Sequence, residues 1–541
     1  MLRRSSLTAG LLALLTLCAS CEGDGKRDVT EPRPSATNKA TNKATNKATN
    51  KGCTRLGDIE VRMRRGYVAG RSPDISLVPR EPDYIGTADM PPHTGPWDYL
   101  VEVPLVFYGP GLIPPTGSVD GGATLADVAP TIEEMIGEEG LLPWEGRPLP
   151  VAATVRDRPR LVLIVVLDGV GRNTLALHDG ASPFLEEMSR LGIDYADATV
   201  GSSPSNTPPI HTTLGTGVFP RKHGIPHVRM RSRDGGYVDP FEGNDADSVR
   251  VPTLADVYDR RTNNVASIGL VATVNWHLGM IGHGASFPGG DRDMAVLLND
   301  LGAVYGDASE YALPDVADPA ALQRFTTELD GADGELDARW RGQDLTESAL
   351  RYMSPAWVDY QTLILKRTIE AGSFGLDGVP DLLYANFKGA DTSGHRFGVT
   401  SPEVGEVVES QDGALRSITA FLDRHMGKKS WVVVVTADHG QTPYPEESDA
   451  YPIRGSELSA DIESRFGRGT VQRVAAAGVF LTDKAPPAPV VARWLGNYSL
   501  SDNLPEGDTV PEARREREEE KLFEMVLAGR RVIAPPTTCR T

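Results

Sequence analysis

Positive charge is scarce in this sequence. Its 541 residues include 55 lysines and arginines against 74 aspartates and glutamates, a net charge of −19. Because proteins that bind nucleic acid present a basic face, this balance argues against a nucleic-acid-binding surface. Cysteine is scarce as well, with four residues, of which Cys18 and Cys21 lie in the N-terminal segment. The apolar run from Leu7 to Ala19 is too short to cross a bilayer comfortably.

The first 21 residues have the features of an export signal. Arg3 and Arg4 precede the apolar run, and small residues lead up to Cys21. This order predicts a signal peptide of the lipoprotein type over residues 1–21, with Cys21 as the lipidated residue. The protein is then expected at the bacterial envelope and in contact with the membrane only through the lipid. Plain secretion to the periplasm or the exterior is the alternative.

A low-complexity stretch follows the signal. Four Thr-Asn-Lys units within residues 35–52 contain no apolar side chain larger than alanine. Such a segment cannot bury enough surface to fold. Residues 22–52 are therefore predicted to be a disordered tether between the lipid anchor and the globular part.

From Leu161 onward, apolar runs alternate with helical patterns. The continuous apolar run Leu161–Leu167 is typical of a strand buried on both faces of a parallel sheet. Two more buried strands are predicted at Pro380–Phe387 and Trp431–Thr436. Helices are predicted at Ser182–Gly192, at Ser401–Met426 and at Ala123–Gly137, the last kinked or split at Pro130. The alternation predicts an α/β fold with a mostly parallel sheet covered by helices on both faces. Residues 232–375 and 441–535 carry fewer strand signals and are expected to hold insertions or a cap.

Acidic residues stand where these three strands end. The first strand leads to Asp168, the second to Asp391 and His395, and the third to Asp438 and His439. Ligands of open α/β sheets collect at the carboxyl ends of the strands, and carboxylates gathered there repel one another unless a cation lies among them. Aspartate and histidine without cysteine suit zinc, with manganese and iron as alternatives. The pattern predicts a metal site; for any single aspartate, a helix cap or a turn is the alternative.

A fourth candidate, Thr207, is followed by Pro208, Pro209 and a helix-like stretch. Threonine at the N-cap with proline at the first position is a typical helix start. The free N–H groups of a helix N-terminus can bind an anion such as a phosphoryl group, and a hydroxyl beside a metal can ionise and act as a nucleophile. The alternative is an ordinary N-cap with no chemistry.

Taken together, these motifs resemble a known group of proteins. The residues that carry the resemblance are Leu167-Asp-Gly169, Thr207-Pro-Pro-Ile-His-Thr-Thr-Leu-Gly-Thr-Gly217, Phe219-Pro-Arg-Lys-His-Gly-Ile225, Asp391-Thr-Ser-Gly-His395 and Thr436-Ala-Asp-His-Gly440. They are similar to the alkaline phosphatase superfamily, and within it to the type I phosphodiesterase/nucleotide pyrophosphatase branch. The resemblance implies an alkaline phosphatase-like fold with two divalent metal ions, zinc first among the candidates. One metal would be held by Asp168, Asp438, His439 and the nucleophile Thr207. Asp391 and His395 would hold the other, for which one histidine is missing.

The missing histidine has a counterpart near the N-terminus. His93-Thr-Gly-Pro-Trp-Asp-Tyr99 and Val103-Pro-Leu-Val-Phe-Tyr-Gly109 resemble a segment that lies far downstream in the superfamily and carries the last metal-binding histidine. The resemblance thus implies that His93 joins Asp391 and His395. It also implies a circularly permuted chain, in which residues 53–150 resemble the end of the usual domain and precede its main part, residues 151–541. Such a rearrangement is tolerated when the original ends lie close together.

The function implied by the resemblance is a two-metal hydrolase of phosphoric esters that works through a phosphothreonine intermediate. Its substrate would be a small-molecule phosphodiester or nucleotide pyrophosphate. A phosphomonoesterase is the first alternative. A monoester dianion would require an extra positive charge near the site, for which Lys388, Arg229 and Arg396 are candidates. A phosphoryl transferase and an inactive, metal-stabilised binding protein are the others. The absence of a Cys-x-Pro-x-Arg motif disfavours the sulfatase branch.

Some positions depart from the family pattern. Val228 stands where the diesterases usually carry a phosphate-binding asparagine, with His227 beside it. His277 and His283 are interpreted as structural histidines with satisfied hydrogen bonds. No functional role is assigned to these three histidines.

Cys53 and Cys539 are the only cysteines of the sequence outside the signal region. In an exported protein a pair of cysteines favours a disulfide. The permutation implied by the resemblance would also make the two residues neighbours. A Cys53–Cys539 disulfide is therefore predicted, with two unpaired thiols as the alternative.

Overall fold

The computed structural model describes residues 48–505, 507–510 and 512–534. The predicted signal peptide with Cys21, most of the predicted tether and Cys539 lie outside the described residues, so lipidation and the disulfide to Cys53 stay predictions. Residues 48–52, predicted as the end of the tether, belong to helix α2 (Ala48–Gly66). The repeat gave no sign of this helix, because the side chains that anchor it come later in the sequence. Among the described residues, no helix is long and apolar enough to span a membrane.

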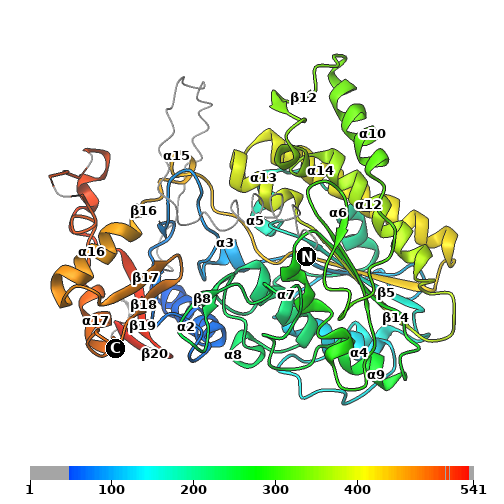
Figure 1. The fold of residues 1–541 in the computed structure, drawn as a ribbon, viewed down its shortest axis with the longest axis horizontal. Helices are drawn as coiled ribbons and strands as arrows, with labels where there is room; N and C mark the ends of the chain where they lie inside the picture. Colours follow the sequence, from blue (N-terminus) through cyan, green and yellow to red (C-terminus); the bar gives the residue numbers. More distant parts are fainter. Residues whose placement is uncertain (1–47, 506, 511, 535–541) are drawn as a thin grey trace, which may run out of the picture.

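A nine-stranded sheet forms the centre of the larger lobe (Figure 1). Five neighbouring strands, β10, β9, β14, β5 and β15, run parallel, whereas β11 and β3 run antiparallel to their neighbours. The prediction of an α/β fold with a mostly parallel sheet is confirmed. In spatial order the strands are β11 (Val304–Tyr305), β10 (Met294–Leu298), β9 (Ile268–Ala272), β14 (Asp381–Phe387), β5 (Leu161–Leu167), β15 (Trp431–Thr436), β3 (Leu105–Tyr108), β6 (Ile193–Tyr195) and β4 (Gly117–Val119).

The central strands are apolar throughout because both faces of the sheet are covered. Alternate residues of β5 pack into different cores, Leu163 into one and Ile164 into the other. The first core is covered by α6 (Pro183–Leu191), α12 (Pro355–Ala371) and α14 (Pro402–His425). The second is covered by α4 (Val128–Met135), α7 (Thr207–Thr216) and α9 (Leu254–Arg261). A 3₁₀ turn precedes α4, so Pro130 stands in the first turn of that helix, where proline is tolerated.

A second sheet forms the smaller lobe (Figure 1). Its five antiparallel strands are, in spatial order, β17 (Val471–Ala475), β18 (Gly478–Leu481), β1 (Ile75–Pro79), β19 (Phe523–Ala528) and β20 (Arg531–Ala534). Helices α16 (Gly455–Phe466) and α17 (Ala488–Leu495) pack on it through a core that includes Ile462 and Leu495. Most of this lobe comes from residues 441–535, where an insertion or cap was expected, but its central strand comes from the N-terminal part.

The other expected insertion, residues 232–375, is in part core. It supplies β9, β10 and β11 of the main sheet. The apolar run of β9 has only five residues, so its sequence signal is weaker than that of β5. The remaining short elements connect or edge the lobes: β2 (Tyr84–Ile85), α3 (Asp98–Val101), α5 (Arg172–Leu177), α8 (Pro220–His223), β7 (Met230–Arg231), β8 (Tyr237–Val238), α10 (Pro319–Asp330), β12 (Arg339–Trp340), β13 (Gln343–Asp344), α11 (Ser348–Tyr352), α13 (Gly389–Phe397), α15 (Pro445–Ser448) and β16 (Pro452–Ile453).

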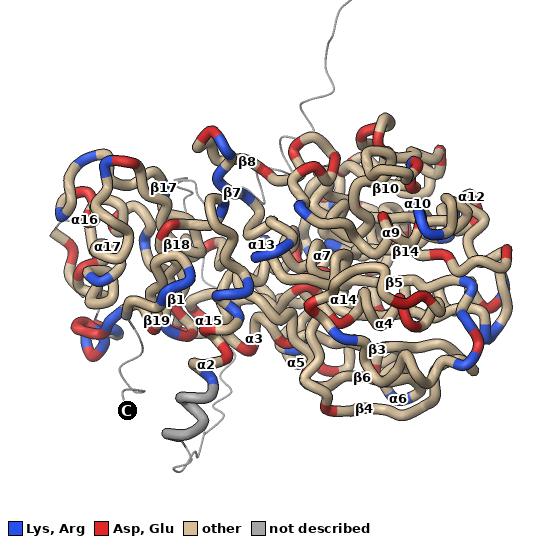
Figure 2. Tube along the Cα trace, turned by 90° about the horizontal axis from the view of Figure 1, so that it is seen from below, with Lys and Arg blue, Asp and Glu red and all other residues tan. Residues whose placement is uncertain are grey.

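Charged residues of both signs are interspersed along both lobes, and lysine and arginine do not gather on one face in the view of Figure 2. This agrees with the composition, in which acidic residues outnumber basic ones.

Phe107→Ala is expected to lower the free energy of unfolding by about 3–5 kcal/mol. Phe107 lies in β3, is fully buried and meets the Tyr195 ring edge-on at 6.0 Å, so truncation leaves a cavity beside the main sheet. Urea denaturation measures the change. Leu336→Ala, at a side chain that is 76% exposed, is the control and should change stability little. An unchanged value for Phe107→Ala would show that the segment before residue 161 does not form part of the main core.

Candidate active site

Three neighbouring strands bring their carboxyl ends together. β5 lies between β14 and β15; Asp168 follows β5, Asp391 stands in the first turn of α13 after β14, and Asp438 follows β15. Seven residues were expected to act as ligands or nucleophile, and the structure brings all of them to this edge. All are buried except the half-buried His395: His93, Asp168, Thr207, Asp391, His395, Asp438 and His439.

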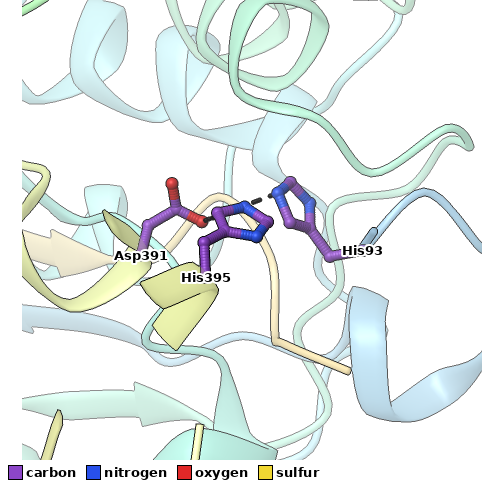
Figure 3. Close-up of side chains that lie close together, drawn as sticks. All are labelled: His93, Asp391 and His395. Carbon is purple, nitrogen blue, oxygen red and sulfur yellow. Dashed lines mark ion pairs between the residues drawn. The ribbon is translucent and has the colours of Figure 1, made fainter. Parts of the chain in front are cut away.

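His93, Asp391 and His395 form a group that we call the His93 cluster (Figure 3). Nε2 of His93 lies 3.5 Å from Asp391 Oδ1, and Nε2 of His395 lies 3.4 Å from the same oxygen. Nδ1 of His93 donates to the Ser205 carbonyl oxygen at 2.9 Å, which leaves Nε2 with its lone pair directed at the carboxylate. Asp391 and His395 come from α13 and His93 from a segment far away in the sequence, as Figure 3 shows.

Asp168, Thr207, Asp438 and His439 form a second group, the Asp168 cluster. Nε2 of His439 lies 3.6 Å from Asp168 Oδ1 and 3.2 Å from Asp438 Oδ2. The two clusters adjoin, because the rings of His93 and His439 stack with their centroids 3.5 Å apart. Two sets of ligand atoms therefore lie side by side in one site.

The donor atoms fit bound metal ions. Asp391 Oδ1, Asp438 Oδ2 and His439 Nε2 are buried and have no hydrogen-bond partner among the described residues. Buried polar atoms normally have partners, so ligand atoms that converge without one fit a shared cation. Burial lowers the pKa of His93 and of His395, which keeps both rings neutral near pH 7 and leaves each a lone pair. Nitrogen and oxygen donors in this arrangement suit divalent metals such as zinc.

Thr207 is the first residue of α7 and is buried. The sequence indicated a helix start here, and this is confirmed, but the N-cap residue is Asn206 rather than Thr207. Asn206 has extended backbone angles and Thr207 is already helical, so the helix begins one residue earlier than predicted. The Thr207 side chain is therefore not used as a cap. Its hydroxyl Oγ1 instead accepts a hydrogen bond at 2.9 Å from Nζ of Lys388.

Lys388 connects the two clusters. Its Nζ donates to Asp168 Oδ1 at 2.8 Å and lies 2.7 Å from Asp391 Oδ2, and its side chain is 1% exposed. Burial alone would raise the pKa of Asp391, but the ammonium group holds that pKa below its usual range. Burial, together with the Asp438 carboxylate, raises the pKa of Asp168. Lys388 contacts the oxygen of Asp391 that faces away from the histidines, so Oδ1 stays directed at the His93 cluster.

Of the three cations considered from the sequence, the structure places Lys388 in the site. Arg396 is exposed, and Arg229 lies near Asp239. The sequence alone could name these residues but could not rank them.

Two polar residues behind Asp168 were not assigned a role from the sequence. Asn386 donates through Nδ2 to Asp168 Oδ2 at 2.9 Å, and the same nitrogen lies 3.2 Å from His211 Nε2. Nδ1 of His211 donates to the Thr207 carbonyl oxygen at 2.8 Å. These contacts hold Asp168 and the start of α7 in place. An asparagine near the carboxyl end of the buried strand β14 is the signal that could have revealed them.

The other histidines differ from one another. His283 pairs with Asp256 at 2.9 Å, which confirms its interpretation as a satisfied structural residue. For His277 that interpretation is wrong: the ring is fully buried and neither nitrogen has a hydrogen-bond partner among the described residues. Its ring and that of His211 meet edge to face with their centroids 4.6 Å apart, and one ligand atom each of Asp168, His211 and His277 lies within 4.8 Å of the others. Both ring nitrogens of His227 also have no hydrogen-bond partner among the described residues.

Fold and site together define the class: this is an α/β protein whose central sheet carries, at the carboxyl ends of its strands, buried groups of aspartate and histidine that could hold metal ions. The model of the family described as type I phosphodiesterase / nucleotide pyrophosphatase matches residues 162–521, and the chain belongs to that family. The matched region includes all three strand ends that lead to Asp168, Asp391 and Asp438, but not His93, which precedes it in the sequence.

Individual relatives are similar over shorter stretches. Alkaline phosphatase PafA of Elizabethkingia meningoseptica is 28% identical over 111 residues, 19% of this chain and 20% of PafA. Alkaline phosphatase PhoV of Synechococcus elongatus is 34% identical over 80 residues, 15% of this chain and 14% of PhoV. The crystal structure of wild-type PafA matches with a TM-score of 0.51 at 16% identity, over 65% of this chain and 81% of PafA. The matched sequence spans a fifth or less of these curated relatives, and the structural likeness supports the fold.

Proposed function

We propose that this chain is a two-metal hydrolase of phosphoric esters in which Thr207 is the nucleophile. The observation that carries the proposal is the position of the Thr207 hydroxyl, which is buried at the first residue of α7 and hydrogen-bonded to the lysine that joins the two clusters. When bound, the metal ions, zinc in this proposal, supply Lewis-acid charge that acidifies the hydroxyl and a water molecule. One metal is assigned to His93, Asp391 and His395, and the other to Asp168, Thr207, Asp438 and His439.

The reaction takes two displacements at phosphorus. The Thr207 oxygen loses its proton and forms a bond to phosphorus, the bond to the leaving alcohol breaks, and the alcohol takes up a proton. Pro208 and Pro209 have no N–H, so the backbone N–H of Thr207 is the donor at the start of α7 for a phosphoryl oxygen. The positive charge of Lys388, beside the nucleophile, offsets the negative charge that shifts onto the phosphoryl oxygens. Water then attacks the phosphothreonine, Thr207 leaves with a proton, and the phosphoryl product is released.

A phosphodiester or nucleotide pyrophosphate is the first substrate class, supported by the family to which the chain belongs. A phosphomonoester is the second candidate, because one observation favours it. A monoester dianion carries one more negative charge than a diester, and Lys388 places a buried positive charge 2.9 Å from the nucleophile. Val228, in turn, supplies no amide donor where the family's diesterases usually have one.

Steady-state assays of zinc-loaded protein with bis-p-nitrophenyl phosphate and p-nitrophenyl phosphate test both candidates. A hydrolase of either kind releases p-nitrophenol from at least one of them. If kcat/KM for the monoester exceeded that for the diester by more than roughly a hundredfold, about 2.7 kcal/mol in activation barrier, the protein would be assigned as a phosphomonoesterase instead of a diesterase. Turnover of neither ester by protein that holds two metals would contradict the hydrolase proposal itself.

Lys388→Met is expected to lower kcat/KM for the monoester by about 10²–10³-fold and to affect the diester less, because the lost charge matters more for a dianion. Methionine keeps most of the volume of the buried side chain. Arg324→Met, at a side chain that is 57% exposed, is the matched control and should leave both rates unchanged. Equal losses on both esters would show that Lys388 does not discriminate between them.

The proposal includes a circularly permuted chain order. Its support is that the two ends of the described chain lie together: Ile59 and Met63 of α2 pack with Met525 and Leu527 of β19. A gene that encodes residues 151–541 followed by a short linker and residues 53–150 tests the idea. Soluble protein with the same kcat/KM and melting temperature is expected, whereas a protein that does not fold would count against permutation.

A further inference from the structure

Three carboxylates meet at the edge of the main sheet that lies away from the active site. Asp259 stands in the last turn of α9, and Asp291 and Asp293 come just before β10. One ligand oxygen of each lies within 4.8 Å of those of the other two. β10 runs parallel to β5, β14 and β15, so its amino end lies opposite the catalytic edge. We call these three residues the Asp293 cluster.

Asp293 is the member that needs an explanation. It is 5% exposed, and among the described residues its carboxylate makes no hydrogen bond and no ion pair. Asp259 differs, because the Asn264 amide can donate to its Oδ2 at 3.0 Å. With no donor and two further carboxylates beside it, the ionised form of this buried group is unfavourable without a cation; burial, followed by the neighbouring carboxylates, raises the pKa of Asp293.

The basic side chains of this region are engaged elsewhere. Arg261 pairs with Glu138 at 3.1 Å, the Arg260 guanidinium lies 4.9 Å from the centre of the Phe287 ring, and Arg292 donates to a backbone carbonyl oxygen at 3.3 Å. Within the described part of the chain, no lysine or arginine pairs with the Asp293 cluster. Its position at the end of α9 adds the negative end of a helix dipole. The protein therefore supplies no cation for this cluster.

We propose that the Asp293 cluster binds a calcium ion. All three ligands are hard oxygen donors, and calcium accepts irregular sets of about six to eight oxygens. Asp291 is exposed, so water can complete the coordination shell. Magnesium requires a near-ideal octahedron, which an irregular cluster of this kind fits less well. The ion would join the end of α9 to the start of β10 and would stabilise the outer strands of the sheet without taking part in the reaction.

Calorimetric titration of calcium chloride into zinc-saturated protein tests the proposal. One additional ion per chain is expected to bind, with a Kd on the order of 0.1–1 mM. Saturating calcium should raise the Tm and leave kcat unchanged. Asp293→Asn should weaken calcium binding at least about tenfold and abolish the calcium-dependent rise in Tm. Without calcium, Asp293→Asn should melt above the wild type, because the substitution removes the unpaired charge.

Two further variants keep the test decisive. Asp291→Asn changes an exposed side chain, so it should leave folding intact, and it should also weaken calcium binding. Asp412→Asn is the matched control: this buried carboxylate accepts two backbone N–H groups at 2.8 and 3.0 Å, so the variant should lose stability but keep the calcium response. Zinc-saturated wild type that takes up no calcium would overturn the proposal. A full calcium response in Asp293→Asn would overturn it as well.

Discussion

Thr207→Ala is expected to lower kcat/KM for phosphoric esters by roughly 10⁴-fold or more. The substitution removes the one hydroxyl that lies buried at the start of α7 and within hydrogen-bond distance of Lys388. No other group of the described site is placed to form the covalent intermediate. The substitution should therefore lower kcat and change KM little. Metal content and melting temperature should change little. Steady-state kinetics together with metal analysis of the same preparation provide the measurement.

Thr207→Ser is the matched control, because it keeps a hydroxyl at the same position. It should retain much of the activity and should form a covalent phosphoserine that mass spectrometry of acid-quenched protein can detect. Wild-type protein should give phosphothreonine at Thr207. If Thr207→Ala kept wild-type rates, the nucleophile would have to be water or another residue, and the two-displacement scheme would be wrong.

His93→Ala is expected to remove one of the two metals and nearly all activity. His93 directs Nε2 at Asp391 from a segment outside the matched family region, so this variant tests whether the N-terminal segment completes the site. Loss of a hydrogen-bond partner of a metal ligand typically lowers metal affinity 10–100-fold. Loss of His93, a direct ligand in this proposal, should lower the affinity for one metal by more than that. Plasma mass spectrometry after dialysis should find about one metal per chain instead of two.

His425→Ala serves as the control for His93→Ala. This histidine stacks on Phe421 in α14, away from the site, and the variant should keep both metals. A strong chelator should inactivate the wild type, and zinc should restore it. His93→Ala that retains two metals and full activity would remove His93 from the ligand set and weaken the argument for a permuted chain.

The central sheet and the carboxylates at its edge were predictable because both follow from local patterns. β5, β14 and β15 are buried on both faces, so each reads as a continuous apolar run that leads to an acidic residue. The place of His93 could not be derived from spacing and came only from the resemblance. Lys388 could be named as a cation but not placed, because its direction depends on how α13 starts after β14.

The smaller lobe was less predictable for a different reason. β1 is five residues long and pairs with β18 and β19, which come from the other end of the sequence. Pairing between such distant segments leaves no trace in local hydrophobic periodicity. The Asp293 cluster was missed in a similar way, because Asp259 is brought to Asp291 and Asp293 only by the packing of α9 beside β10.

The position of β1 also has a consequence for biosynthesis. Ile75 is made early, yet its partner Ala528 in β19 emerges from the ribosome more than 400 residues later. At a synthesis rate of about 5–20 residues per second, β1 waits roughly 20–90 seconds for its partner strands. During that interval its apolar side chains, such as Leu77 and Val78, have no sheet to join. Nascent chains of this protein therefore carry an unpaired β1 until the last strands of the smaller lobe have been made.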